Sequence, residues 1–195
     1  MNWSAFLIFA FVTVYTPGPN TIMSMTNGSR LGFRRSLPFI GGVWLGLTVI
    51  MLLSAVFCSV VSALIPKIVL PMRIVGAGYI LFLAWKVFRG GKIEEREEKS
   101  SFLSGLLLQF VNVKIYLYGI VCMQSYILPV YAGQTGLLIG FALLLGVIAL
   151  SSNLCWAAFG SVFRRLMEKH SRLIRTVLAL LLVYCALSLL LSQAQ

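Results

Sequence analysis

Six long apolar segments, separated by polar loops, constrain the fold of this 195-residue chain. A helix needs about 20 mostly apolar residues to cross the ~30 Å hydrocarbon core of a bilayer. The segments that satisfy this requirement are Trp3–Met25, Leu37–Leu64, Leu70–Phe88, Phe102–Leu128, Thr135–Val162 and Leu173–Leu191. Only 11% of the residues are charged, against about 25% in soluble domains. The sequence therefore predicts an all-α polytopic membrane protein with six transmembrane helices, the first of them retained and not cleaved as a signal peptide.

The basic residues are sorted by loop, and this sorting predicts the orientation of the chain. Thirteen of the 16 Lys and Arg residues lie in or beside the first, third and fifth loops. Because cytoplasmic loops are rich in Lys and Arg, we expect these loops to face the cytoplasm and both termini to face the periplasm. The net charge of +11 favours anionic lipid headgroups as partners. A nucleic-acid partner is excluded, because the charges are not gathered on one face with stacking aromatic residues.

The third loop divides the chain into two halves. It mixes basic residues with four glutamates, Glu94, Glu95, Glu97 and Glu98, a pattern typical of a solvated linker. We predict a single transmembrane domain, residues 1–195, in which a cytoplasmic linker at 92–100 joins a first half at 3–91 to a second half at 101–192. Three helices per half is an odd number, so the halves would lie in opposite orientations. This is the inverted-repeat design of many transporters.

The first span of each half contains an interruption near its middle. The first interruption is Thr16-Pro17-Gly18-Pro19-Asn20, and the second is Gln109 followed by Asn112-Val113-Lys114. Proline has no N–H group and interrupts a helix, and interrupted helices in corresponding places indicate the binding site of a transporter. We expect Thr16 to cap a new half-helix with Pro17 at its first position. The free N–H groups at that helix start would attract a carboxylate.

Lys114 is the basic residue that lies deep inside a predicted span. It follows Phe102 by twelve residues, or ~18 Å of helix, and a charge at that depth costs at least ~2.5–3.5 kcal/mol. The chain has no Asp, and its five Glu all lie in predicted cytoplasmic loops. No acid within the membrane is therefore available to Lys114, and we predict that it binds the anionic group of a substrate.

Three asparagines and two glycine pairs complete the candidate site. Asn20 and Asn112 flank the interruptions and are expected to contact a ligand or a gate, whereas Asn153 either contacts a ligand or bridges two helices. The second span of each half carries a Gly-x-x-x-Gly motif, which lets helices approach closely in lipid. The two motifs are Gly42 with Gly46 and Gly136 with Gly140. They are expected to pack helices together, and they permit a homodimer.

The sequence gives no support for an enzyme or for a cofactor-binding protein. The only histidine, His170, lies in the basic fifth loop, so the usual acid–base pairs are missing. No glycine-rich phosphate-binding loop is present, and ATP is therefore not the direct energy source. The cysteines lie inside apolar segments and are expected to be buried apolar side chains; they are Cys58, Cys122, Cys155 and Cys185. We predict no metal site, no disulfide and no cofactor.

At these residues the chain resembles the lysine exporter and homoserine/threonine exporter (LysE/RhtB) family of bacterial inner-membrane amino-acid exporters. The resemblance covers essentially the whole chain. It rests on Thr16-Pro17-Gly18-Pro19 in the first span, on Gly41-Gly42-Val43-Trp44-Leu45-Gly46 in the second and on Asn112-Val113-Lys114 in the fourth. Many members have a proline where this chain has Val113, and an acidic residue where it has Leu47. The second difference leaves no obvious proton carrier.

Within the family, three further stretches are most similar to exporters of cysteine and O-acetylserine. These stretches are Leu108–Ile115, Asn153–Ala157 and Leu178–Ala186. The resemblance implies secondary-active, proton-driven export of small neutral amino acids across the bacterial inner membrane. The residues alone leave two alternatives open. One is a passive anion-selective or amino-acid channel with Lys114 in its pore, and the other is an accessory subunit that uses the interruptions as partner contacts.

Overall fold

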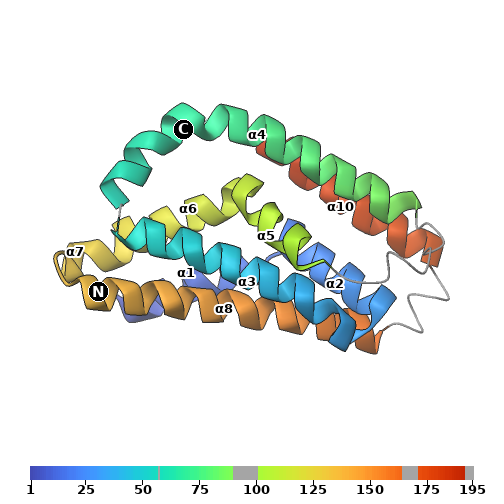
Figure 1. Cartoon of the computed structure of the whole chain (residues 1–195), viewed down its shortest axis with the longest axis horizontal. Helices are drawn as coiled ribbons and strands as arrows, with labels where there is room; N and C mark the ends of the chain where they lie inside the picture. Colours follow the sequence, from blue (N-terminus) through green and yellow to red (C-terminus); the bar gives the residue numbers. More distant parts are fainter. Residues whose placement is uncertain (57, 90–100, 164–170, 192–195) are drawn as a thin grey trace.

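The computed structural model describes residues 1–56, 58–89, 101–163 and 171–191, which are almost entirely helical (Figure 1). The elements are α1 (Trp3–Tyr15), α2 (Pro19–Leu31), α3 (Phe33–Val56), α4 (Cys58–Arg89), α5 (Phe102–Val111), α6 (Val113–Val121), the π-helix η2 (Cys122–Ile127), α7 (Leu128–Tyr131), α8 (Thr135–Val162) and α10 (Ser171–Leu191). The described residues contain no strand. The predicted linker at 92–100 and His170 lie outside the described residues, so the division into halves stays a prediction.

The apolar helices fit a protein that crosses a membrane several times. Within the described ranges, four helical stretches are long and apolar enough to span a bilayer, and the bent pair α1–α2 gives a fifth. The four are α3, α8, nearly all of α10, and a stretch that comprises α6, η2 and α7. α8 has the bounds predicted for the fifth span, and α10 contains the predicted sixth span. The all-α polytopic class is therefore confirmed, whereas the count of six spans stays a prediction.

One predicted boundary between spans is wrong. The sequence pattern places the second span at Leu37–Leu64 and the third at Leu70–Phe88, with a turn near Pro66 and Pro71. In the structure α3 has already ended, and α4 runs as one helix of 32 residues through both prolines. A membrane helix tolerates proline because neighbouring helices and local adjustments satisfy the backbone groups that proline frees. Pro66 and Pro71 therefore lie inside α4 and do not mark the predicted turn.

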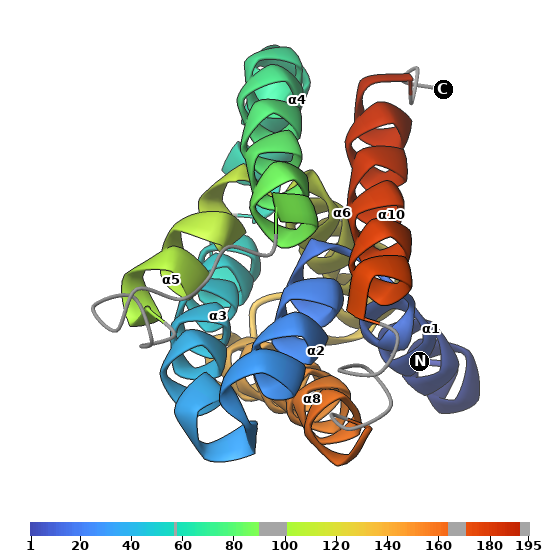
Figure 2. The same ribbon diagram turned by 90° about the vertical axis from the view of Figure 1, so that its right-hand side faces the viewer.

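The helices form a central bundle and a flanking pair. In the bundle, α3 packs on both α5 and α8, and α2 packs on α8. The flanking pair is α4 and α10, which run side by side along one edge of the molecule (Figures 1 and 2). This arrangement brings α1, α4, α6 and α10 around the point where the chain passes from α1 to α2.

Two apolar cores divide the bundle along its length. One core is formed by α1, α6, η2 and the adjacent parts of α3 and α8, and it contains Phe6 and Tyr118. The other core is formed by α2, α4, α5, α10 and the remaining parts of α3 and α8. Along α3 the change from one core to the other falls between Val43 and Leu47. The two cores meet at the level of the interrupted helices.

The two glycine pairs differ in their surroundings. A Cβ on Gly42 would collide with the backbone of α5, and a Cβ on Gly46 would lie 2.9 Å from Cγ of Gln109. The close approach of α3 to α5 therefore depends on small residues at both positions. A Cβ on Gly136 or Gly140 would meet nothing within 4 Å. The matching positions of the two motifs in the sequence do not produce matching contacts among the described helices.

The cysteines follow the prediction only in part. Cys122 is buried and Cys185 is half-buried, but Cys155 is exposed on the surface of α8. An apolar segment of a membrane protein can turn a side chain toward lipid as well as toward protein, so position inside a span does not imply burial in the chain. The side chain of Cys58 is not among those described.

Candidate functional site

The first interruption bends the first span by 52° between α1 and α2. The N–H of Thr16 bonds back to α1 at 3.0 Å, and its Oγ1 donates to the carbonyl of Thr13 at 2.7 Å. α2 begins at Pro19, and Oγ1 of Thr21 accepts the N–H of Gly18 at 2.9 Å. The predicted cap is therefore wrong, since Thr16 closes α1 and Gly18 precedes the first residue of α2. The physical reason is that the side chain of Thr16 already donates a hydrogen bond to the backbone of α1. Pro19, in turn, suits the first position of a helix.

The fourth span is interrupted at a single residue, Asn112. α5 ends at Val111 and α6 begins at Val113, and between them Asn112 has φ −89° and ψ 89°. The interruption is present although position 113 is not proline. The side chain of Asn112 donates to Oδ1 of Asn20 at 3.2 Å, and such side-chain bonds compete with the regular helix.

Three buried amide side chains join the two interruptions. Asn20 and Gln109 bond to each other through both ends of their amides, at 2.8 and 3.1 Å. Gln109 also donates to the carbonyl of Gly105 at 3.0 Å. The exposed fractions are 0% for Gln109, 4% for Asn112 and 8% for Asn20, and an unpaired amide is costly at such depth. Gln109 belongs to the second interruption in the sequence but is not among the predicted binding residues, although its place three residues before Asn112 puts the two on neighbouring helical positions.

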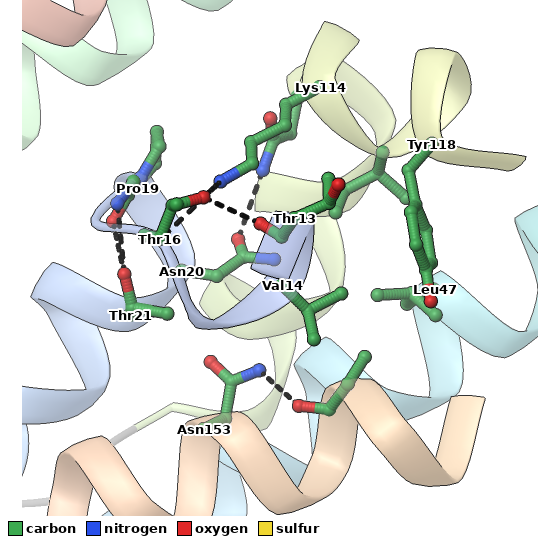
Figure 3. A pocket seen from close by; sticks show the side chains of 14 residues that line it. Thr13, Val14, Thr16, Pro19, Asn20, Thr21, Leu47, Lys114, Tyr118 and Asn153 are labelled. Atoms are coloured by element: carbon green, nitrogen blue, oxygen red, sulfur yellow. Dashed lines mark hydrogen bonds between the residues drawn. The ribbon is translucent and has the colours of Figure 1, made fainter. Parts of the chain in front are cut away.

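Lys114 reaches from α6 to the first interruption. Its Nζ donates to Oγ1 of Thr16 at 2.9 Å and to the Thr16 carbonyl at 3.3 Å (Figure 3). A Cβ on Gly18 would lie 3.4 Å from the same Nζ, so the ammonium group lies beside the start of α2. The N–H groups of that helix start carry partial positive charge. The chain has no Asp, and all five Glu lie outside the described residues, so the described helices hold no acid that balances these two positive groups.

Two cavities are lined by Lys114. A cleft of about 400 Å³ lies among α1, α4, α6 and α10, and a small cavity of about 20 Å³ lies among α1, α2, α3, α6 and α8. Asn112 and Tyr118 also line both. The cleft has room for a small molecule, whereas the small cavity has room for about one water-sized group. Figure 3 shows the small cavity between Lys114, Asn20, Leu47 and Asn153.

α8 holds both half-helices of the first span. Asn153 accepts a hydrogen bond from Oγ of Ser24 in α2 at 2.9 Å. Oγ of Ser152 and Nε1 of Trp156 donate to two carbonyl groups at the end of α1, at 2.8 and 3.3 Å. These bonds satisfy backbone groups that the end of a helix leaves without partners. Asn153 thus bridges two helices while it lines the small cavity, and sequence reasoning missed Ser152 and Trp156.

The structure brings all eight predicted binding or gating residues to the two cavities. The small cavity is lined by Thr16, Gly18, Pro19, Asn20, Asn112, Lys114 and Asn153, and the cleft is lined by Pro17. The four predicted packing glycines line neither cavity. Tyr118 and Thr13 line both and were missed, because an aromatic or hydroxyl side chain in an apolar span is most simply interpreted as packing.

A helical protein with several apolar spans, whose interrupted helices meet at a polar site between two apolar cores, has the architecture of a membrane transporter. Residues 11–193 match the LysE type translocator family, and the chain belongs to this family. It is 40% identical over 191 residues to a cysteine/O-acetylserine efflux protein of Salmonella choleraesuis (strain SC-B67), covering 95% of this chain and 96% of that protein. The efflux protein of the same name from Escherichia coli (strain K12) is 39% identical over 188 residues, 94% of each chain. No solved structure matches the chain.

Family membership confirms the class predicted from the sequence. The chain is a transporter and not an enzyme, and it is a multi-pass protein of the inner membrane. The resemblance to the LysE/RhtB family is confirmed as well.

Proposed function

We propose that this translocator is a secondary-active exporter of small neutral amino acids, above all cysteine and O-acetylserine, across the bacterial inner membrane. The observation that carries the proposal is the position of the Lys114 ammonium group beside the start of α2, in a cleft whose described helices contain no acid. The names of relatives that are 39 and 40% identical support cysteine and O-acetylserine as substrates.

The proposed carboxylate site lies between Lys114 and the first turn of α2. The first intrahelical bond of α2 is donated by Ile22 to the Gly18 carbonyl at 2.9 Å. The backbone N–H groups of Asn20 and Thr21 come before that bond and point toward the helix start. A carboxylate there would accept from these groups and from Lys114, which would exchange Thr16 for the substrate. This exchange lowers the repulsion between the ammonium group and the helix start.

The proposed transport cycle uses two inverted halves of three helices each, with both termini in the periplasm. Support comes from the interruptions at Asn20 and Asn112, which lie in separate predicted halves and are joined by a direct hydrogen bond from Asn112 to Asn20 and by the bonds of Gln109 with Asn20. Rocking of one half against the other would open the site to each side in turn. We further propose that protons drive export, a role that the family resemblance supports and that we assign to no residue. A homodimer stays a prediction from the glycine motifs.

The decisive experiment is counterflow of labelled L-cysteine into liposomes that contain the purified protein, with and without an imposed pH gradient. Lys114→Met should lower the rate at least about tenfold, because a hydrogen bond to a charged group contributes about 1.5–3 kcal/mol. The matched control is Lys86→Met at the end of α4, which lines neither cavity and should stay within about twofold of the wild type. Membrane expression of both variants should be unchanged.

Two results would contradict the proposal. Normal counterflow by Lys114→Met would exclude the carboxylate role of this lysine. Single-channel currents, in place of saturable exchange, would replace the carrier by the anion-selective channel that the sequence also permits. Absence of any flux by the purified wild-type protein would favour an accessory subunit.

A further inference from the structure

We infer that Tyr118 is a substrate-binding residue whose hydroxyl group accepts a hydrogen bond from the α-ammonium group of the amino acid. This inference rests on the proposed function, and it adds to the site a residue outside the two interruptions. The geometry points to a substrate that is bound across the small cavity and the cleft, with different groups in each. Its ammonium group occupies the small cavity, its carboxylate lies between Lys114 and the start of α2, and its side chain extends into the cleft.

The hydroxyl of Tyr118 is buried and has no hydrogen-bond partner among the described residues. Tyr118 is 1% exposed, and buried polar groups in native proteins are nearly always paired. It lies one helical turn after Lys114 on α6, and residues four apart share a helix face. Both residues line the small cavity, and Figure 3 shows the Tyr118 hydroxyl ending beside Leu47 at its wall. An unpaired hydroxyl at this place is a vacant acceptor at the wall of a cavity that Lys114 and the start of α2 also line.

An amino-acid exporter of this kind must bind an ammonium group without an acid. The described helices contain no Asp or Glu, so neutral oxygen atoms have to accept the hydrogen bonds of the ammonium group. In an α-amino acid the ammonium and carboxylate groups are attached to the same carbon atom. An acceptor must therefore line the same cavity as Lys114 and the start of α2, which Tyr118 does. The small cavity, at about 20 Å³, suits a group as small as an ammonium.

The division of the site accounts for substrates with different side chains. The cleft of about 400 Å³ is lined by Tyr118 and Lys114 from one side and by α4 and α10 from the other. A thiol and the longer acetoxy group both fit a space of that volume, while the main-chain groups keep one set of contacts. The ring of Tyr118 is also fixed in place, because it stacks on Phe9 with centroids 6.4 Å apart.

The structure provides a matched control for the unpaired hydroxyl itself. Oγ of Ser54 is likewise buried without a partner among the described side chains, and Ser54 is 1% exposed. It lines neither cavity. Loss of the Ser54 hydroxyl should therefore affect packing alone, whereas loss of the Tyr118 hydroxyl should affect the recognition of one substrate group.

The test compares inhibition of labelled L-cysteine counterflow by L-cysteine, O-acetylserine and 3-mercaptopropionate, which is cysteine without the amino group. For the wild type we expect 3-mercaptopropionate to inhibit about tenfold more weakly than L-cysteine. In Tyr118→Phe the inhibition constants of L-cysteine and O-acetylserine should rise by about the same factor, near tenfold. That of 3-mercaptopropionate should stay within about twofold. Ser54→Ala should leave all three values within about twofold.

Several outcomes would overturn the inference and leave the proposed exporter intact. An equal rise for all three compounds in Tyr118→Phe would show a structural role. A rise for only one of the two amino acids would show recognition of a side chain. A wild-type protein that does not distinguish cysteine from 3-mercaptopropionate would show that no ammonium site exists. Failure of the wild type to transport either amino acid would instead overturn the proposed function, and the inference with it.

Discussion

Replacement of Gln109 by leucine tests whether the buried amides hold the two interruptions together. Gln109 is 0% exposed and takes part in three hydrogen bonds, two with Asn20 and one with the carbonyl of Gly105. Leucine has a similar size, so the change removes hydrogen bonds without a large change in packing volume. It also takes away the acceptor that the side-chain NH₂ of Asn20 now uses.

The expected loss follows from these contacts. Hydrogen bonds between membrane helices contribute about 0.6 kcal/mol each on average, so the two bonds with Asn20 account for about 1.2 kcal/mol. A buried donor left without its partner costs a further ~1–3 kcal/mol. We expect Gln109→Leu to lower the free energy of unfolding by about 2–4 kcal/mol. The double variant Asn20→Leu/Gln109→Leu should lose less than the sum of the two single losses, because neither residue is left as the stranded partner of the other, and the loss of the bond from Asn112 to Asn20 is already counted in Asn20→Leu.

The assay is equilibrium unfolding in mixed micelles, with a denaturing detergent as titrant and far-ultraviolet circular dichroism as the signal. The matched control is Gln134→Leu, since Gln134 is exposed and makes no side-chain cap bond at the start of α8. It should change the free energy of unfolding by no more than about 0.5 kcal/mol. A loss in Gln109→Leu no larger than that of the control would refute the reasoning. Additive losses in the double variant would show that Asn20 and Gln109 do not act as a pair.

Two further predictions concern packing and the second interruption. Gly42→Leu should lower the thermal unfolding temperature of the purified protein by about 5 °C or more, because the new side chain collides with the backbone of α5. Gly136→Leu should change it little, and equal decreases would contradict the packing of α3 on α5. Val113→Pro should keep counterflow within about twofold of the wild type, because Val113 is the first residue of α6, where proline is well suited. A loss of more than tenfold would show that this position needs its N–H group.

Local features that could be predicted from the sequence are those with a backbone cause. Pro17 and Pro19 lack N–H groups, so the first span had to break near them whatever surrounds it. The start of α8 follows Gly133, whose φ of +81° is one that glycine adopts easily. The apolar segments likewise predict a membrane protein, since a fold surrounded by water could not bury so much apolar surface. These predictions required no knowledge of which helices touch.

Features that depend on contacts between distant segments could not be predicted. The prolines of α4 look like turn residues in a sequence, but lipid and neighbouring helices permit a continuous helix there. The six-residue π-helix η2 has no sequence signal, although it places Tyr126 against Phe6 and Phe9 with centroids 5.9 Å apart. Gly42 and Gly136 occupy matching positions in their predicted halves, yet among the described residues a Cβ on Gly42 would meet the backbone of α5 and a Cβ on Gly136 would meet nothing within 4 Å.

Lys114 shows how the two kinds of information combine at the site. The sequence of the whole chain indicates that no acid within the membrane is available to this lysine. That inference does not depend on which helices pack together. The structure then adds that the nearest polar partner is Thr16, 98 positions away in sequence. A hydroxyl and a carbonyl accept hydrogen bonds from two of the three N–H groups of this ammonium, but they leave its charge in place. The site therefore stays positive, and an arriving carboxylate gains from a charge that the resting protein does not neutralise.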